Sequence, residues 1–246
     1  CDEIIEEKIG GKKWLDHFNK SPSIFVNATT FGLFLAEQVV ELDNSISLNP
    51  ISWSLHNGEK HHHITLHWMT DRIDSGPIVV SKSFKIYEKD SAIDLMKNSI
   101  KYGEQLIFQF LKNIKKNNKK IPKINQNLKK RKYNSNQIPN SGFINWSTKA
   151  SQIHNFVRAF DYKPYSSFWL EPKTINKKNI YYVIKVKKTN IKCKAKPGNI
   201  FFYKKKYMYV STLDFWIAIL KIKFKNKYIN PIQFFNNQDK FKIINE

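Results

Sequence analysis

Apolar residues recur along this chain with two different spacings, and each spacing predicts one type of element. Between Ser91 and Lys112 they follow the 3.6-residue period of a helix, and Ser91 with Asp94 is placed to cap its start. Phe31 to Leu42 is also expected to be helical. Runs rich in β-branched and aromatic residues predict strands at 24–30, 64–69 and 78–84. This mixture predicts an α/β N-terminal domain with a mainly parallel sheet.

Beyond Pro172 the apolar residues alternate with polar ones, as they do in half-buried strands. The alternation predicts strands at 180–186, 200–203, 207–210 and 216–224. In the last of these we expect a buried face that comprises Trp216, Ala218, Leu220, Ile222 and Phe224. A short helix capped by Ser147 is expected before the strands, with a shared apolar face of Ala150, Ile153, Phe156, Val157 and Phe160. Several short strands after one helix predict a small β-barrel-like (OB-like) domain.

The stretch between these regions is strongly basic. Residues 113–140 contain nine Lys or Arg and no acid, together with Pro122, Pro139 and several Asn, which is typical of an extended linker. The sequence therefore predicts three regions: an α/β domain at 1–112, which is shortened at its N-terminus because its first strand and helix are scarcely visible before Trp14, a linker at 113–140, and a C-terminal domain at 141–246.

Charge is distributed unevenly along the 246 residues. The formal net charge is +22, but residues 1–112 carry −3 and residues 113–246 carry +25. A half with this much positive charge is expected to meet a polyanion such as RNA. The alternative is a bias toward Lys, Asn and Ile codons, because 39 of the 42 basic residues are Lys.

The remaining composition limits the location of the protein. No apolar stretch reaches the roughly 20 residues that span a bilayer. Cys1 and Cys193 are the only cysteines, so we expect neither a disulfide framework nor a cysteine-based zinc site, and a reducing, cytoplasmic setting fits best. The chain starts at Cys1 without a Met or a basic-then-apolar leader, so no signal peptide is expected, and a true start upstream of Cys1 stays open.

Two blocks of sequence carry specific motifs. The first lies in 49–80 and contains Ser52-Trp53, Asn57-Gly58-Glu59, Ile64-Thr65 with His67, and Asp71-Arg-Ile-Asp-Ser-Gly-Pro-Ile78. The second lies in 126–173 and contains Gln126 to Tyr133, Ile144-Asn-Trp146, Val157-Arg-Ala-Phe-Asp161, Pro164-Tyr165 and Pro172-Lys173. In this order and separation they resemble the folate-dependent formyltransferases, a family that includes methionyl-tRNA formyltransferase. The second block is closer to formyltransferases of biosynthetic pathways.

The resemblance implies a reaction and a set of site residues. Members transfer a formyl group from 10-formyltetrahydrofolate to an amine, here of methionyl-tRNA, an amino sugar or an amino acid. It implies that Asp74 helps to remove the amine proton and that Ile73, Ser75 and Gly76 border the folate pocket. His62 stands at the family's His position, and Arg158 is a candidate contact for a substrate phosphate or for the other domain.

The chain departs from the family in one respect. Members carry an Asn-x-His before the Pro50 segment, but here Asp43-Asn-Ser-Ile-Ser-Leu-Asn49 contains none. Either the electrophilic half of the site has been lost, or a loop is absent from this sequence. One lost oxyanion donor costs about 3–4 kcal/mol in related chemistry. The alternative function is therefore an inactive formyltransferase fold that binds partners through its basic C-terminal half.

Other interpretations remain open for several of these residues. Asp74 before Gly76-Pro77 is also typical of a turn. His61, His62, His63 and His67 resemble a metal site, but a solvated strand end is preferred and no metal is expected. Trp146, Trp169 and Trp216 are suited to base stacking, although core packing is the preferred interpretation.

Overall fold

The computed structural model describes residues 49–68, 76–117, 121–127, 134, 137–167, 169–204 and 207–244, together with the backbone of 24–27. The helix expected at Phe31–Leu42 lies outside these residues. The chain forms two compact units: one comprises 1–40, 63–84 and 98–132, and the other 41–62, 85–97 and 133–246. These units alternate along the chain, and the sequence-based division at residues 112 and 140 stays a prediction.

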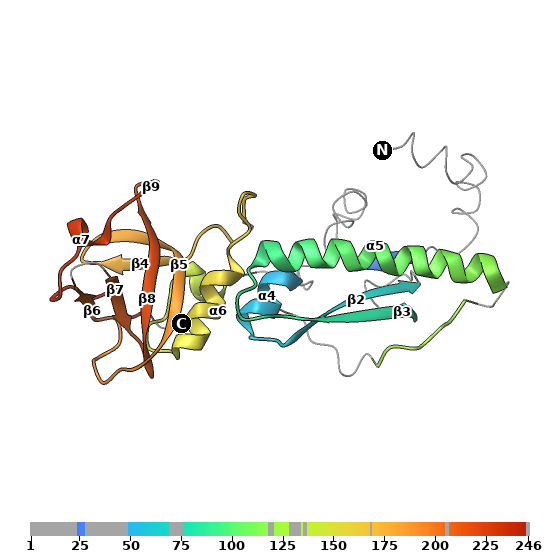
Figure 1. Ribbon diagram of the computed structural model, residues 1–246, viewed down its shortest axis with the longest axis horizontal. Helices are drawn as coiled ribbons and strands as arrows, with labels where there is room; N and C mark the ends of the chain where they lie inside the picture. Colours follow the sequence, from blue (N-terminus) through green and yellow to red (C-terminus); the bar gives the residue numbers. More distant parts are fainter. Residues whose placement is uncertain are drawn as a thin grey trace. The chain divides into compact units, whose positions relative to one another are not determined.

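The first sheet has three strands in the order β1-β2-β3: β1 (Ile24–Asn27), β2 (His61–Trp68) and β3 (Ile78–Lys85). Figure 1 labels β2 and β3. All three were predicted as strands. β1 pairs with β2 in antiparallel register. Backbone bonds from Trp68 to Pro77 (2.9 Å) and from Ile86 to Lys60 (2.8 Å) place β3 antiparallel to β2.

The expected mainly parallel sheet is therefore wrong for these strands. A parallel pair needs a crossover of a dozen or more residues, whereas residues 69–77 connect β2 directly to β3. The α/β character itself is confirmed, because helices and strands are mixed in this part of the chain.

Helix α5 (Ala92–Asn117) confirms the helix predicted from Ser91 to Lys112. The Asp94 carboxylate accepts hydrogen bonds from the Ser91 backbone (2.9 Å) and hydroxyl (2.7 Å), as the sequence indicated. Burial raises the pKa of Asp94, but these two bonds outweigh it and the net shift is downward. The helix continues into the predicted linker because no Pro or Gly occurs between Lys112 and Pro122.

The second sheet is antiparallel throughout. Its strands are β4 (Lys173–Asn176), β5 (Asn179–Lys192), β6 (Ile200–Tyr203), β7 (Tyr207–Ser211), β8 (Phe215–Phe224) and β9 (Lys227–Tyr228). Their order is β4-β5-β8-β7-β6, and β9 pairs with β8 (Figure 1). The four predicted strands are confirmed as β5, β6, β7 and β8, while the short β4 and β9 were not predicted.

The buried face of β8 differs from the predicted one. Ile217, Ile219 and Ile222 are buried, whereas Leu220 is 52% exposed. The β5–β8 ladder is irregular where Lys185 lies opposite Lys221, and this irregularity shifts the alternation between Ile219 and Ile222. A bulge of this kind breaks the strict period of two on which the prediction relied.

The expected barrel is not confirmed, because the described strands do not close on themselves. β4 and β6 lie at the two ends of the strand order. The C-terminal segment 239–242 instead bonds to both ends: Lys242 N–H donates to Ile175 O (2.7 Å), and Phe241 N–H donates to Gly198 O (2.8 Å). A short helix, α7 (Pro231–Phe234), leads into this segment.

Helices α4 (Pro50–His56) and α6 (Ala150–Ala159) pack together in the second unit. The short 3-10 turn η3 (Pro139–Gly142) precedes α6 along the chain. The predicted buried face of α6 is confirmed. The predicted cap is wrong, since α6 begins after Lys149 and its first N–H, at Ala150, donates to Asp214 Oδ1 (2.8 Å) from the β7–β8 turn.

Aromatic rings fill the core of the second unit. Trp53 and Trp169 meet edge to face at 5.1 Å between ring centroids, and Phe160 contacts Trp169 at 5.3 Å. Trp146 is fully buried and stacks on Phe241 at 5.2 Å. The core interpretation is thus confirmed for Trp146 and Trp169. Within the described residues, no helix is both long and apolar enough to cross a bilayer.

Candidate functional site

The Asp74 loop is held at both of its ends. The backbone N–H of Trp68, the last residue of β2, donates to Pro77 O at 2.9 Å, just before β3 begins. Ile73, Asp74 and Ser75, which the sequence assigns to catalysis and folate binding, lie outside the described residues. The structure therefore gives the frame of the loop, and their roles stay predictions.

Gly76 is the member of the predicted site that the structure describes at this frame. A Cβ atom at this position would lie 1.6 Å from the Trp68 carbonyl oxygen and 3.3 Å from His67 Nδ1. No side chain fits there without a backbone shift. The Gln126 side-chain amide donates to Gly76 O at 2.6 Å and fixes the peptide from the other side.

The segment 121–127, which was predicted as part of an extended linker, packs against this frame. Ile124 and Ile78 exchange backbone hydrogen bonds of 2.7 and 2.9 Å at the start of β3. The Trp68 indole donates to Pro122 O at 3.0 Å, and Lys123 Nζ lies 4.9 Å from the centre of the Trp68 ring. The base of the loop is therefore built from three segments of the chain.

His67 adds an imidazole to the same frame. Its side chain is buried, and Nδ1 lies 2.9 Å from the Trp68 carbonyl oxygen. This geometry favours the tautomer with the proton on Nδ1, which makes Nε2 a hydrogen-bond acceptor. The sequence singled out His67 as part of a motif but gave it no role.

His62 belongs to the other unit and points into its interior. It is buried, with the Ser54 hydroxyl 3.0 Å from Nδ1, while His61 and His63 are exposed on the opposite face of β2. Its predicted substrate contact stays a prediction. In the described part of the chain, no group of three or more His, Cys, Asp or Glu side chains is placed to hold a metal ion.

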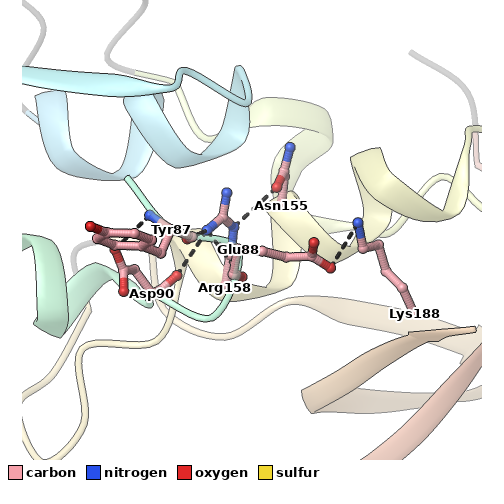
Figure 2. A network of polar contacts seen from close by, with 6 residues as sticks. All are labelled: Tyr87, Glu88, Asp90, Asn155, Arg158 and Lys188. Carbon is pink, nitrogen blue, oxygen red and sulfur yellow. Dashed lines mark hydrogen bonds and ion pairs between the residues drawn. The ribbon is translucent and has the colours of Figure 1, made fainter. Parts of the chain in front are cut away.

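Arg158 lies at the centre of a polar network on α6 (Figure 2). Its Nη1 donates to the backbone carbonyls of Tyr87 (2.8 Å), Asp90 (3.0 Å) and Glu88 (3.3 Å), and its Nε donates to Asn155 Oδ1 (3.0 Å). Burial lowers the pKa of Arg158, although a guanidinium stays protonated at neutral pH. These bonds hold the turn between β3 and α5.

A second pair strengthens the same network. Lys188 Nζ on β5 lies 2.8 Å from Glu88 Oε1 (Figure 2). The hydrogen bond from Lys188 holds the pKa of Glu88 below its usual value. The Asp90 carboxylate accepts the Tyr87 N–H at 2.7 Å and closes the turn on itself. Arg158 thus acts as a clamp on residues 87–90, which lie in the segment that the sequence assigned to the first domain.

A buried polar network was missed by the sequence analysis. The Tyr162 hydroxyl donates to Asn49 Oδ1 (2.7 Å) and lies 3.0 Å from Ser52 Oγ, which donates to Ala159 O (2.7 Å). Burial raises the pKa of Tyr162, and the bonds to Ser52 and Asn49 partly offset it. Ser52 stands inside a quoted motif and Tyr162 directly follows another, Val157 to Asp161, but their distance along the chain concealed the contact.

Comparison with known proteins identifies the family. The sequence model described as "Formyl transferase" matches residues 46–111, and the model described as "Formyl transferase, C-terminal domain" matches residues 138–240. The chain belongs to the formyltransferase family. The resemblance inferred from the two motif blocks is thereby confirmed.

Several proteins of known name or structure are similar to this chain. The bifunctional polymyxin resistance protein ArnA of Wigglesworthia glossinidia brevipalpis is 30% identical over 166 residues, which cover 62% of this chain and 25% of that protein. The N-formyltransferase from Helicobacter canadensis, solved with folinic acid and dTDP-3-aminofucose, is 29% identical, with a TM-score of 0.55 over 69% of this chain and 59% of that one.

A third similar protein is WlaRD, a sugar 3N-formyl transferase solved in the presence of dTDP and 5-N-formyl-THF. It is 26% identical, with a TM-score of 0.53 over 72% of this chain and 60% of that one. The chain therefore spans a quarter of the curated relative and about three fifths of each of these two solved structures.

Proposed function

We propose that this chain transfers a formyl group from 10-formyltetrahydrofolate to an amine, and that the acceptor is an amino sugar linked to a nucleotide. The observation that carries the proposal is Gly76, which admits no side chain at the point where the Asp-Ser-Gly loop of the family motif enters β3. The folate forms in the two similar solved structures support the donor, and dTDP-3-aminofucose in one and dTDP in the other support the acceptor class. Methionyl-tRNA and a free amino acid are the competing acceptors.

Each proposed site residue has a definite task. When bound, the donor supplies the formyl group. Asp74 takes a proton from the attacking amine, and Ile73, Ser75 and Gly76 border the donor pocket. His62 and Arg158 serve the acceptor side, Arg158 through the 87–90 turn that it holds. The contacts at the ends of the loop are consistent with these roles. Trp68 lies too close to Gly76 for a side chain at that position, and Gln126 donates a hydrogen bond to the Gly76 carbonyl.

Calorimetric titration with folinic acid, combined with a formylation assay on dTDP-3-aminofucose, tests the proposal. We expect folinic acid to bind and Asp74→Asn to lower the formylation rate by about 100-fold or more. Asp71→Asn removes the same charge from the same loop and serves as the matched control, with a rate near that of the unmodified chain. Equal rates for both variants would refute the role of Asp74, and formylation of methionyl-tRNA alone would refute the acceptor class.

The finer architecture belongs to the same proposal. The matched ranges 46–111 and 138–240 support a catalytic domain within 1–112 and a C-terminal domain within 141–246. The bonds of segment 239–242 to both ends of the second sheet support a barrel-like C-terminal domain. A cytoplasmic location is proposed from the two cysteines.

The second candidate function is an inactive formyltransferase fold that binds partners through its basic half. It is favoured by the absence of Asn-x-His between Asp43 and Asn49. Asn49 itself caps α4, because its Oδ1 accepts from Ser52 N–H (3.1 Å) and from Tyr162. If a folded chain fails to bind folinic acid, this candidate replaces the first.

A further inference from the structure

One face of the second sheet carries a row of aromatic side chains, which we call the aromatic sheet face; its members are Phe201, Tyr203, Tyr207, Tyr209 and Trp216. Residues directly opposite each other in antiparallel strands lie on the same face of the sheet. The registers place Phe201 opposite Tyr209, Tyr209 opposite Ala218, and Ala218 opposite Lys187. Tyr203 lies opposite Tyr207 in the next row.

Three of the five rings of the aromatic sheet face are exposed and Tyr209 and Trp216 are half-buried, whereas the other face of the same strands forms the core. Phe201, Tyr203 and Tyr207 are 45%, 47% and 47% exposed. Their sequence neighbours on the other face, Ile200 and Met208, are each 2% exposed. Phe201 and Trp216 lie 5.9 Å apart between ring centroids although β7 separates their strands, so the rings form a continuous surface.

Positive charge surrounds these rings. Lys187 ends the row that begins at Phe201, Lys185 lies opposite Lys221, and Lys204 Nζ lies 5.3 Å from the centre of the Tyr203 ring. Like charges directly across a ladder are unfavourable unless a counter-ion or an anionic partner is present.

Acidic side chains do not balance these lysines. Between Glu171 and Asp239 the only acid in the sequence is Asp214. Its carboxylate is bonded to the N–H groups of Ala150 and Phe215, and a single acid is too few to balance the lysines of this stretch.

We propose that the aromatic sheet face binds single-stranded nucleic acid. Unpaired bases stack on exposed aromatic rings, and their phosphates are neutralised by flanking lysines. A duplex hides the faces of its bases and would use only the lysines. This inference holds whether or not the chain transfers formyl groups, because it uses none of the residues assigned to that reaction.

Fluorescence anisotropy of the full chain with a labelled oligothymidylate of about 20 nucleotides tests the proposal. We expect Tyr203→Leu/Tyr207→Leu to weaken binding by about tenfold or more while the slope of log K against log salt is kept. Leucine retains an apolar side chain but lacks the flat ring. Lys187→Ala should weaken binding and reduce the slope. Tyr165→Ala removes a ring that is 62% exposed outside the sheet and is the matched control.

Three results would overturn the proposal. Equal affinity for oligothymidylate, a duplex of the same length and inorganic polyphosphate would reduce the interaction to charge alone. Unchanged binding by the leucine variant, with its near-ultraviolet circular dichroism intact, would exclude stacking. Sedimentation that shows a dimer lost in the leucine variant, without oligothymidylate binding, would assign the face to a second copy of the chain.

Discussion

Gly76 lies so close to the backbone of Trp68 that only a residue without a Cβ atom fits there. Because a Cβ there would lie 1.6 Å from the Trp68 carbonyl oxygen, Gly76→Ala must move either β3 or the end of β2. We expect a loss of about 3 kcal/mol in the free energy of unfolding, at the upper end of overpacking costs. Urea denaturation measures this loss, with Ser83→Ala, an exposed change on the same strand, as the control. A loss below that of the control would mean that the close approach is absent in solution.

His154 makes the stability of the second unit depend on pH. Burial, with the nearby positive charges of Arg158 and Lys188, lowers the pKa of this imidazole from 6.5 to about 4. Between these two values the unfolded chain binds more protons than the folded one, so stability is full above pH 6.5 and falls as the pH approaches 4. The whole shift corresponds to about 3 kcal/mol, and partial exposure of the ring reduces the expected loss to about 2 kcal/mol. Urea denaturation at several pH values measures it.

His154→Gln is the variant that isolates this effect. It keeps a polar side chain but cannot gain a proton, so its unfolding free energy should fall less than that of the unmodified chain over the same range. Parallel pH profiles for the two proteins would contradict the assignment to His154.

For single residues, the sequence identified candidate site residues but not the residues that they contact. Gly76 was predicted as part of the site because it stands in a recognisable motif, and the structure adds the steric reason. Asn49 and Tyr162 are 113 positions apart, and their hydrogen bond follows from the packing of α4 on α6, which no local pattern encodes. Arg158 was singled out, but its carbonyl acceptors at 87–90 required the fold to be known.

Among the elements, α6 depends on a cap from the β7–β8 turn, 64 residues further along the chain. Asp214 accepts the Ala150 N–H, the Phe215 N–H and the Thr212 hydroxyl; burial raises its pKa, but these bonds outweigh it and the pKa is lowered. Asp214→Ala should therefore cost about 1–2 kcal/mol of unfolding free energy, in the range of lost N-caps. Thermal unfolding measures the change. Asp214→Asn keeps one acceptor oxygen and should lose less, and equal losses in both variants would contradict the capping role.

Periodicity predicted elements well where packing is regular and failed where it is not. The 3.6-residue pattern found α5, and alternation found β5 to β8. The buried face of β8 was predicted wrongly because the irregularity at Lys185 and Lys221 shifts one residue out of the ladder. The Ser147 cap was predicted wrongly because Asp214, remote in sequence, occupies that place.

In the molecule as a whole, Arg158 joins the two segments that the family models match separately. It lies in the 138–240 match and holds the turn at 87–90, which lies in the 46–111 match. Arg158→Met should leave the carbonyls of Tyr87 and Asp90 without this donor and cost about 2 kcal/mol of unfolding free energy. Arg158→Lys should restore only part of this, since an ammonium lacks the planar fork.

Denaturant unfolding of both variants checks this prediction. Lys112→Met removes an exposed cation from α5 and is the control for loss of charge alone. A loss in Arg158→Met no larger than in the control would show that the clamp contributes nothing to stability.

Topology was the part of the architecture that the sequence predicted least. The short 69–77 connection favours an antiparallel arrangement of β2 and β3. The sequence analysis instead predicted a parallel sheet, because helices and strands are mixed in this region. In the second sheet, strand number and alternation suggested closure, but the order β4-β5-β8-β7-β6 leaves two ends. Which strands pair is decided by contacts between distant residues.

The segment 239–242 covers part of the two edges of the second sheet. Unpaired sheet edges are templates on which a second chain can add a strand, and proteins avoid intermolecular pairing by covering them. Here one short stretch covers part of both, through Ile175 and Gly198. Removing the residues from Asp239 onward would therefore expose unpaired backbone groups at two sheet edges at once. Such a truncated chain should aggregate during expression even if its remaining strands still pair correctly.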